Sequence, residues 1–152
     1  MIRFISGGEV MGLKMKTAFI CYMLSLLVLL VFGFSYLLRS EFMPYHSVTV
    51  GMQWGEVAPS FQVLILALMR VTGGLCLASG LSQFFLLIIP FRRGEAWARY
   101  LIPAVGVLSC ASALNAMLYE AMNTPASPPI APVLAALVLI VTGFIFSLFK
   151  TG

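Results

Sequence analysis

One arginine lies inside a long apolar stretch, a position where a charge needs an explanation. Arg70 is the only charged residue within residues 61–89. A guanidinium at depth in a bilayer is costly, and it is retained where it faces protein, water or a partner group. Glu120 is the only charged residue within residues 100–122, which makes it a candidate partner. We therefore expect Arg70 to point into the protein or into a protein interface.

The helical spacing around these two charges predicts two stripes of small and polar residues. The first stripe consists of Arg70, Gly74, Ala78 and Ser82. The second consists of Gly106, Ser109, Ala113, Ala116 and Glu120, with Ser112 and Asn115 alongside. Small residues let neighbouring helices approach closely, so both stripes are expected to face inward.

The resulting polar cluster has a structural and a functional interpretation. Its expected members are Arg70, Ser112, Asn115 and Glu120. As a structural feature, Arg70 and Glu120 would form an ion pair that locks the helices, or Arg70 would extend toward the membrane surface. As a functional feature, the four side chains would line a polar pocket in the outer half of the membrane.

The connection at residues 39–60 contains the chain's one histidine and is the place to look for a metal site. Met43, His46 and Met52 combine thioethers with an imidazole, a ligand set that suits copper, Cu(I) in particular. A single histidine makes a poor site, however. Tyr45 and Trp54 already explain the loop as an anchor at the membrane interface. We expect no bound metal.

A basic turn follows the apolar stretch that contains Arg70. Arg92, Arg93 and Arg99 lie there within a few residues of one another. Such a turn could bind lipid phosphates or an acidic patch on a partner. A topology signal is the simpler explanation, since basic residues hold a loop on the cytoplasmic side.

The composition places the protein in a membrane. Of 152 residues, 61% are hydrophobic and 9% are charged, whereas about a quarter of the residues in a soluble domain carry charge. The net charge of +4 is explained by membrane topology and gives no indication of nucleic-acid binding. The chain has no aspartate and no phosphate-binding glycine loop. We expect no cofactor, and the absence of paired catalytic residues favours a non-enzymatic role.

Four apolar stretches are long enough to cross a membrane as helices. They cover residues 17–38, 61–89, 100–122 and 131–149. Prolines bracket the connections, and Pro90 is expected to end the second stretch. The sequence thus predicts an all-α integral membrane four-helix bundle forming a single domain over residues 1–152. The second stretch is long, so we expect it to tilt, to kink near Gly73 and Gly74, or to begin above the membrane surface.

The distribution of basic residues predicts the orientation. Seven lysines and arginines fall on one side of the predicted membrane: Arg3, Lys14, Lys16, Arg92, Arg93, Arg99 and Lys150. Only Arg39 falls on the other side. Because basic loops stay cytoplasmic, both termini are expected in the cytoplasm and residues 39–60 are expected outside. The membrane is expected to be a bacterial plasma (inner) membrane.

Residues 68–84, LMRVTGGLCLASGLSQF, resemble the helix pattern of DoxX-like small membrane proteins. In this pattern an arginine is followed by a glycine three residues on and by a second glycine seven residues further. The resemblance implies a four-helix membrane protein, and some members of that family are linked to quinone-dependent oxidation. Here the arginine helix comes second instead of first, and Gln83 occupies the neighbourhood where the family commonly has a lysine.

Three functions are compatible with these features. The first is a non-catalytic accessory or stabilising subunit that packs against other transmembrane subunits or against copies of itself. The second is a protein that binds a lipophile, a quinone or a lipid, near Arg70, Asn115 and Glu120. Copper binding by the loop at residues 39–60 ranks third.

Overall fold

The structure, a computed structural model, describes residues 12–149, and every regular element within that range is a helix. The elements are α1 (Leu13–Leu38), α2 (Pro44–Val50), η1 (Trp54–Glu56), α3 (Pro59–Leu86), η2 (Leu87–Phe91), α4 (Ala96–Asn123) and α5 (Ile130–Leu148). Four long helices, α1, α3 continued by η2, α4 and α5, are long and apolar enough to cross a membrane. The all-helical fold class is confirmed.

The long helices match the predicted stretches, with differences at their ends. Helix α1 begins at Leu13 and α4 at Ala96, each four residues before the predicted limit. Their added first turns carry Lys14 and Arg99, side chains that suit a membrane interface. A search for uninterrupted apolar sequence stops at such residues, although the helical hydrogen bonds continue through them.

The expected end at Pro90 is wrong, because the chain passes through this proline as a π-helical turn. Element η2 covers Leu87–Phe91 with Pro90 inside it. A proline ring in an α-helix clashes with the carbonyl group four residues earlier and lacks the N–H that this carbonyl would accept. The wider π turn accommodates both the proline ring and the missing N–H. The helix continues through Pro90 and ends one residue later, at Phe91. The glycine pair Gly73 and Gly74 produces no break in α3.

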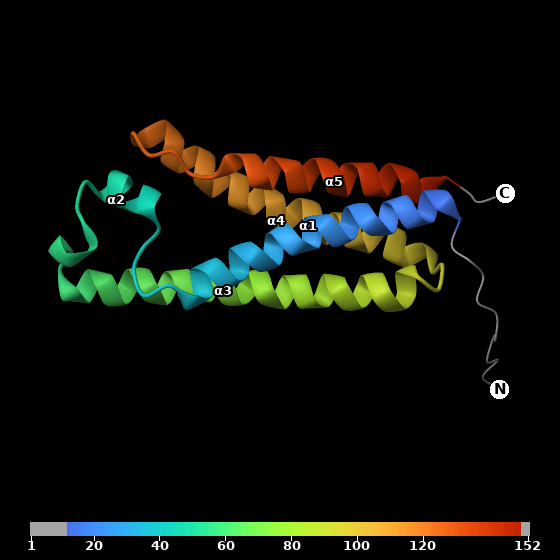
Figure 1. Ribbon diagram of the computed structural model, residues 1–152, viewed down its shortest axis with the longest axis horizontal. Coiled ribbons are helices and arrows are strands. Elements are labelled where there is room, and N and C mark those ends of the chain that lie inside the picture. The colour runs from blue at the N-terminus through green and yellow to red at the C-terminus, as the bar shows by residue number, and fades with distance from the viewer. Residues whose placement is uncertain (1–11, 150–152) are drawn as a thin grey trace.

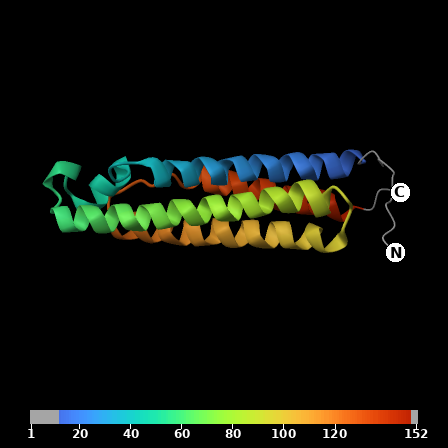
Figure 2. The ribbon, with the colours of Figure 1, turned by 90° about the horizontal axis from the view of Figure 1, so that it is seen from below.

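The four long helices lie side by side, and α1 is the one with the most extensive contacts (Figures 1 and 2). It packs along both α3 and α5, while α4 packs along α5. Helices α3 and α4 touch each other much less, although they are consecutive in the chain. The start of α1, the turn after η2 and the end of α5 lie together at one end, here called the turn end. Helix α2 lies at the other, here called the α2 end.

Glycines bring the backbones of α1 and α3 into contact. A Cβ atom added at Gly73 would lie 2.6 Å from the backbone nitrogen of Leu37 and 2.7 Å from the carbonyl oxygen of Gly33. Both contacts are with main chain, which cannot rotate away as a side chain can. On the other side of α1, a Cβ at Gly143 of α5 would meet the ring of Tyr22 at 3.0 Å. Glycine therefore permits close crossings on both sides of α1.

The stripe predicted to face inward on α3 is wrong, because a different set of α3 residues is buried. The buried residues of α3 are Met69, Gly73, Gly80 and Gln83. In the predicted stripe, Arg70, Ala78 and Ser82 are exposed and Gly74 is half-buried. The physical reason is the crossing described above, since Gly73 faces the α1 backbone, whereas a Cβ at Gly74 would have no neighbour within 4 Å.

This crossing yields a matched stability test. Replacing Gly73 by alanine should destabilise the protein by about 1–3 kcal/mol, because the added methyl group forces the α1 and α3 backbones apart. Replacing the adjacent Gly74 by alanine adds the same methyl group in open space, and its effect should stay within about 0.5 kcal/mol. Unfolding in mixed micelles with increasing denaturing detergent measures both values. Equal losses in the two variants would contradict the proposed role of the crossing.

Candidate functional site

The structure does not join the members of the predicted polar cluster. Arg70 and Asn115 are exposed, and no hydrogen bond or ion pair links Arg70 to Asn115 or Glu120 within residues 12–149. Glu120 instead accepts a hydrogen bond through its Oε1 atom from the Thr49 hydroxyl group. Ser112 bonds the carbonyl oxygen of Leu108 in its own helix.

The helix register explains the position of Arg70. Gly73 of α3 lies against Leu37, in the last turn of α1, and Arg70 precedes Gly73 by three residues. At about 1.5 Å per residue, Arg70 is therefore roughly 4.5 Å further toward the α2 end. This places it level with the end of α1, near the height of Arg39. Counting residues from the end of the apolar stretch gave a deeper position, because α3 extends well beyond the end of α1.

Helix α2 is fastened to α1 and α4 by polar contacts that the sequence did not predict. The hydroxyl groups of Tyr36 in α1 and Tyr45 in α2 are hydrogen-bonded. Thr49, which bonds Glu120 of α4, also lies 3.2 Å from the carbonyl oxygen of Tyr45. The short helix α2 thus connects two long helices at the α2 end. No periodic signal identifies a helix of only seven residues.

An apolar cluster holds the same segment against α3. It consists of the buried side chains Phe42, Met43, Val57 and Met69, with Tyr36, Tyr45, Trp54 and Ile65 packed around them. Trp54 meets Phe42 edge to face at a centroid distance of 5.0 Å. The connection at residues 39–60 is therefore a packed cap and not an open loop.

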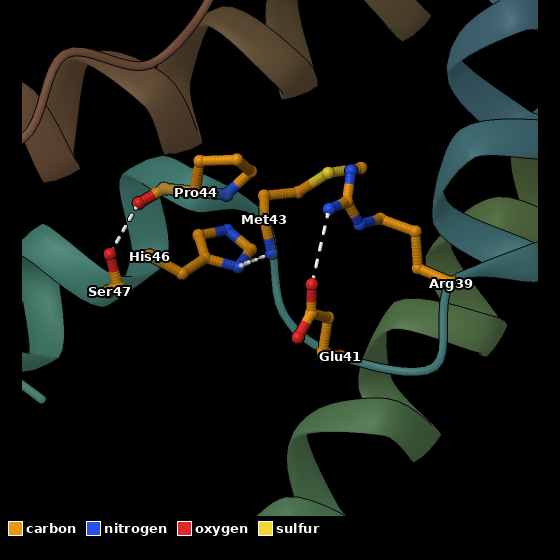
Figure 3. Close-up of polar contacts among 6 residues, drawn as sticks. All are labelled: Arg39, Glu41, Met43, Pro44, His46 and Ser47. Carbon is orange, nitrogen blue, oxygen red and sulfur yellow. Dashed lines mark hydrogen bonds and ion pairs between the residues drawn. The ribbon is translucent and has the colours of Figure 1, made fainter. Parts of the chain in front are cut away.

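The candidate copper ligands point in different directions (Figure 3). The Nδ1 atom of His46 accepts a hydrogen bond of 3.3 Å from the backbone N–H of Met43, while the Met43 thioether runs toward Arg39. Arg39 and Glu41 form an ion pair of 3.7 Å nearby. Met52 is exposed. Within the described residues, no three His, Cys, Asp or Glu side chains gather in a way that could hold a metal ion.

A cavity of about 440 Å³ lies between the four long helices. Its walls are mostly apolar, with contributions from every long helix. The polar and small residues among its lining are Ser25, Thr72, Cys76, Ser79, Gln83, Gly106, Ser109, Cys110, Ser112, Ala113, Ala116 and Ala136. Four residues of the stripe predicted on residues 100–122 are among them, namely Gly106, Ser109, Ala113 and Ala116. These four residues of the stripe face the cavity, with Gly106 buried and Ala116 exposed, while Glu120 does not line it.

The cavity opens sideways between α3 and α4. Leu75 of α3 and Leu108 of α4 both line it, yet 66% and 69% of their surfaces are exposed. Thr72, Ser112 and Ala116 likewise line it and are exposed. The opening follows from the packing, because α3 and α4 have few contacts to close it.

Three polar side chains in the cavity form a directional chain of hydrogen bonds. Ser109 donates to the carbonyl oxygen of Val105 at 3.0 Å. Its hydroxyl oxygen is 3.4 Å from that of Ser79, which therefore donates to it. Gln83 in turn donates through Nε2 to Ser79 at 3.4 Å. The sequence pattern missed Ser79 and Gln83 as site residues, although a glutamine inside a membrane-length apolar stretch was the available signal.

The basic turn lies at the turn end, opposite α2 (Figure 1). Arg92 and Arg93 are exposed, whereas Arg99 is half-buried. Trp97 donates from its indole nitrogen to Glu95 at 2.5 Å, so the one acidic residue of the turn is occupied. Arg92 and Arg93 are the accessible arginines of this turn.

The position of His46 predicts a pH-dependent cap. Burial lowers the pKa of His46 below its usual value of about 6.5, with a smaller opposing effect from Glu120. When α2 is undocked, His46 regains its usual pKa and binds a proton more readily. Acid therefore favours undocking. Docking should keep its full strength above about pH 6.5 and weaken as the pH falls from there toward the lowered pKa.

Trp54 fluorescence in a Trp97→Phe background measures this docking, because Trp54 packs on Phe42 within the cap. His46→Gln keeps an acceptor for the Met43 N–H and does not titrate. We expect this variant to lose the fluorescence change that the wild type shows as the pH falls below about 6.5. An unchanged pH profile in His46→Gln would contradict the assignment.

Comparisons with protein-family models, curated protein sequences and solved structures found no match to this chain. The resemblance of residues 68–84 to DoxX-like proteins therefore stays a prediction.

Proposed function

We propose that this is an integral membrane four-helix bundle whose cavity binds a small lipophile, such as a lipid or a quinone. The single observation that carries the proposal is the cavity of about 440 Å³ with its opening between α3 and α4. Small-molecule pockets have volumes of about 300–1,000 Å³ and mostly apolar walls with a few polar groups. The cavity fits both criteria.

The direction of the opening supports a lipophile over a water-soluble ligand. The opening lies along the middle parts of α3 and α4, between helices of membrane-spanning length. In a bilayer, this part of the surface faces hydrocarbon. A lipophile could enter sideways from the bilayer without crossing water, whereas a polar solute could not reach the opening.

The charge distribution supports a cytoplasmic turn end. Among the described residues, five basic residues lie there: Lys14, Lys16, Arg92, Arg93 and Arg99. Arg39 and Arg70 are nearer the α2 end. Arg3 and Lys150, counted in the sequence prediction, lie outside the described residues. We propose a bacterial inner membrane protein with cytoplasmic termini and an external α2 end.

In this orientation, Arg70 meets the outer headgroups. The helical segment Pro59–Phe91 has 33 residues, so it is roughly 50 Å long, compared with about 30 Å for the hydrocarbon core. If Phe91 lies at the inner boundary, the outer boundary falls close to Arg70. Its exposed guanidinium can then reach lipid phosphates, which explains why it has no acceptor among residues 12–149.

Part of the exposed surface favours a second candidate function, that of a subunit in a larger membrane assembly. Gly74, Ala78 and Ser82 form a stripe of small residues on α3, with exposed positions at Ala78 and Ser82. Such residues permit close contact with a transmembrane helix of a partner or of a second copy.

Native mass spectrometry of protein purified in a mild detergent tests the lipophile proposal. We expect a stoichiometric small molecule on the wild-type chain and its loss from Ala113→Phe, which fills the cavity. Ala78→Phe adds the same side chain on the exposed face of α3 and should retain the molecule. A stoichiometric partner protein without any small molecule would instead support the subunit function and overturn lipophile binding.

Cysteine labelling tests the orientation. In a background with Cys21, Cys76 and Cys110 replaced by alanine, Gly55→Cys places a thiol at the exposed α2 end, where a Cβ meets no neighbour within 4 Å. Arg93→Cys places one at the exposed turn end. In intact cells, a membrane-impermeant maleimide should label only the Gly55→Cys protein. Labelling of Arg93→Cys alone would show the opposite orientation.

A further inference from the structure

We infer that the cavity selects an uncharged lipophile with a hydroxyl head group, and that the side-chain amide of Gln83 binds this head group. The inference rests on the proposed function, since it specifies the ligand of the same cavity. It depends on three observations: the burial of Gln83, the hydrogen bonds that its amide leaves unmade, and the absence of charge from the cavity lining.

The first observation concerns burial. The residue Gln83 is only 6% exposed, and it lines the cavity between α3 and α4. A buried amide without partners is destabilising, and in a bilayer no bulk water can compensate. A glutamine at this position therefore needs partners for its donors and its acceptor.

The second observation is that the protein supplies only one of these partners. A side-chain amide has two N–H donors and one carbonyl acceptor. Gln83 uses one donor, in the 3.4 Å bond to Ser79. Ser79 and Ser109 are engaged with each other, and Ser109 donates to the backbone. Within the described residues, the other Nε2 hydrogen and the Oε1 atom of Gln83 have no hydrogen-bond partner.

A hydroxyl group matches the two free positions. It can accept a hydrogen bond from the free N–H of Gln83 and donate its own hydrogen to Oε1. An ester or ether oxygen could only accept, and it would leave Oε1 without a donor. An alkane would satisfy neither position.

The third observation excludes charged head groups. None of the described residues that line the cavity is a lysine, arginine, histidine, aspartate or glutamate. Moving a phosphate, carboxylate or ammonium ion into such a site has a desolvation free energy far larger than the stabilisation that hydrogen bonds to one amide provide. Arg70 cannot neutralise a charged head group in the cavity, because it is not among the lining residues.

The position of Gln83 also sets the direction of the ligand. Along α3, the cavity lining runs from Thr72 to Gln83, a distance of roughly 16 Å at about 1.5 Å per residue. Gln83 is the lining residue of α3 nearest the turn end. The head group therefore lies toward the turn end, and the alkyl chain extends toward the α2 end along the opening.

Photo-crosslinking with three matched probes tests this inference. The probes are dodecanol, dodecane and dodecyl phosphate, each with a diazirine at the middle of the chain. They are applied to protein in phosphatidylcholine nanodiscs, and labelled peptides are mapped by mass spectrometry. The proteins are wild type, Gln83→Leu, Ala113→Phe, and Gln53→Leu as a matched control at an exposed position outside the cavity.

We expect dodecanol to label the cavity residues of α3 and α4 in wild type and Gln53→Leu. Loss of the amide in Gln83→Leu should weaken dodecanol labelling by about 2- to 12-fold, the effect of one net hydrogen bond. Dodecane labelling should stay unchanged in Gln83→Leu, which shows that the variant is folded. Dodecyl phosphate should label the cavity weakly in every protein.

Results of two kinds would overturn the inference, one at the head group and one at the cavity itself. Equal dodecanol labelling of wild type and Gln83→Leu, or strong labelling by dodecyl phosphate, would refute the head-group assignment. If dodecane labelling was still abolished by Ala113→Phe, the cavity would remain a lipophile site. No cavity labelling by any probe would refute the proposed function itself.

Discussion

The backbone contact between α1 and α3 at Gly33 and Gly73 is the constraint on which the remaining structure depends. In lipid, helices gain no hydrophobic free energy by associating, so close packing must hold them together. Gly73 lets the two backbones touch, and Gly143 permits a similar approach of α5 to Tyr22 on the other side of α1. With α1 held between α3 and α5, helix α4 packs on α5 and has little contact with α3. The cavity and its opening are consequences of this arrangement.

The same arrangement requires a separate closure at the α2 end. Because α3 and α4 have few contacts with each other, a further connection at the α2 end helps to hold the long helices together. Helix α2 does so through Tyr45, which bonds Tyr36 of α1, and through Thr49, which bonds Glu120 of α4. Burial that raises the pKa of Tyr45 and lowers that of His46 keeps both side chains uncharged near neutral pH. The cap is thus stable in the neutral state of its titratable side chains.

The sequence predicted the long helices well, because apolar length is a strong signal, and it predicted the inward stripe of α4. It misjudged the buried face of α3, since Gly73 and Gly74 are the same residue type and only the path of α1 distinguishes them. The place of Arg70 along the bundle was misjudged because α3 extends beyond the end of α1, so Arg70 lies level with the end of that helix. The hydrogen bond between Thr49 and Glu120 joins residues far apart in the chain and depends on tertiary packing. Gln83 could have been recognised as a buried polar residue, but its partners could not.

The central claim is that the space between α3 and α4 holds a lipophile and is not closed by the protein itself. Structure determination in a lipid nanodisc, at a resolution that shows bound lipids, tests this claim most directly. The account predicts elongated density inside the cavity, with one end beside Gln83 and the other toward the opening. Direct contact of α3 with α4 that eliminates the cavity, or a partner helix inserted between them, would contradict it.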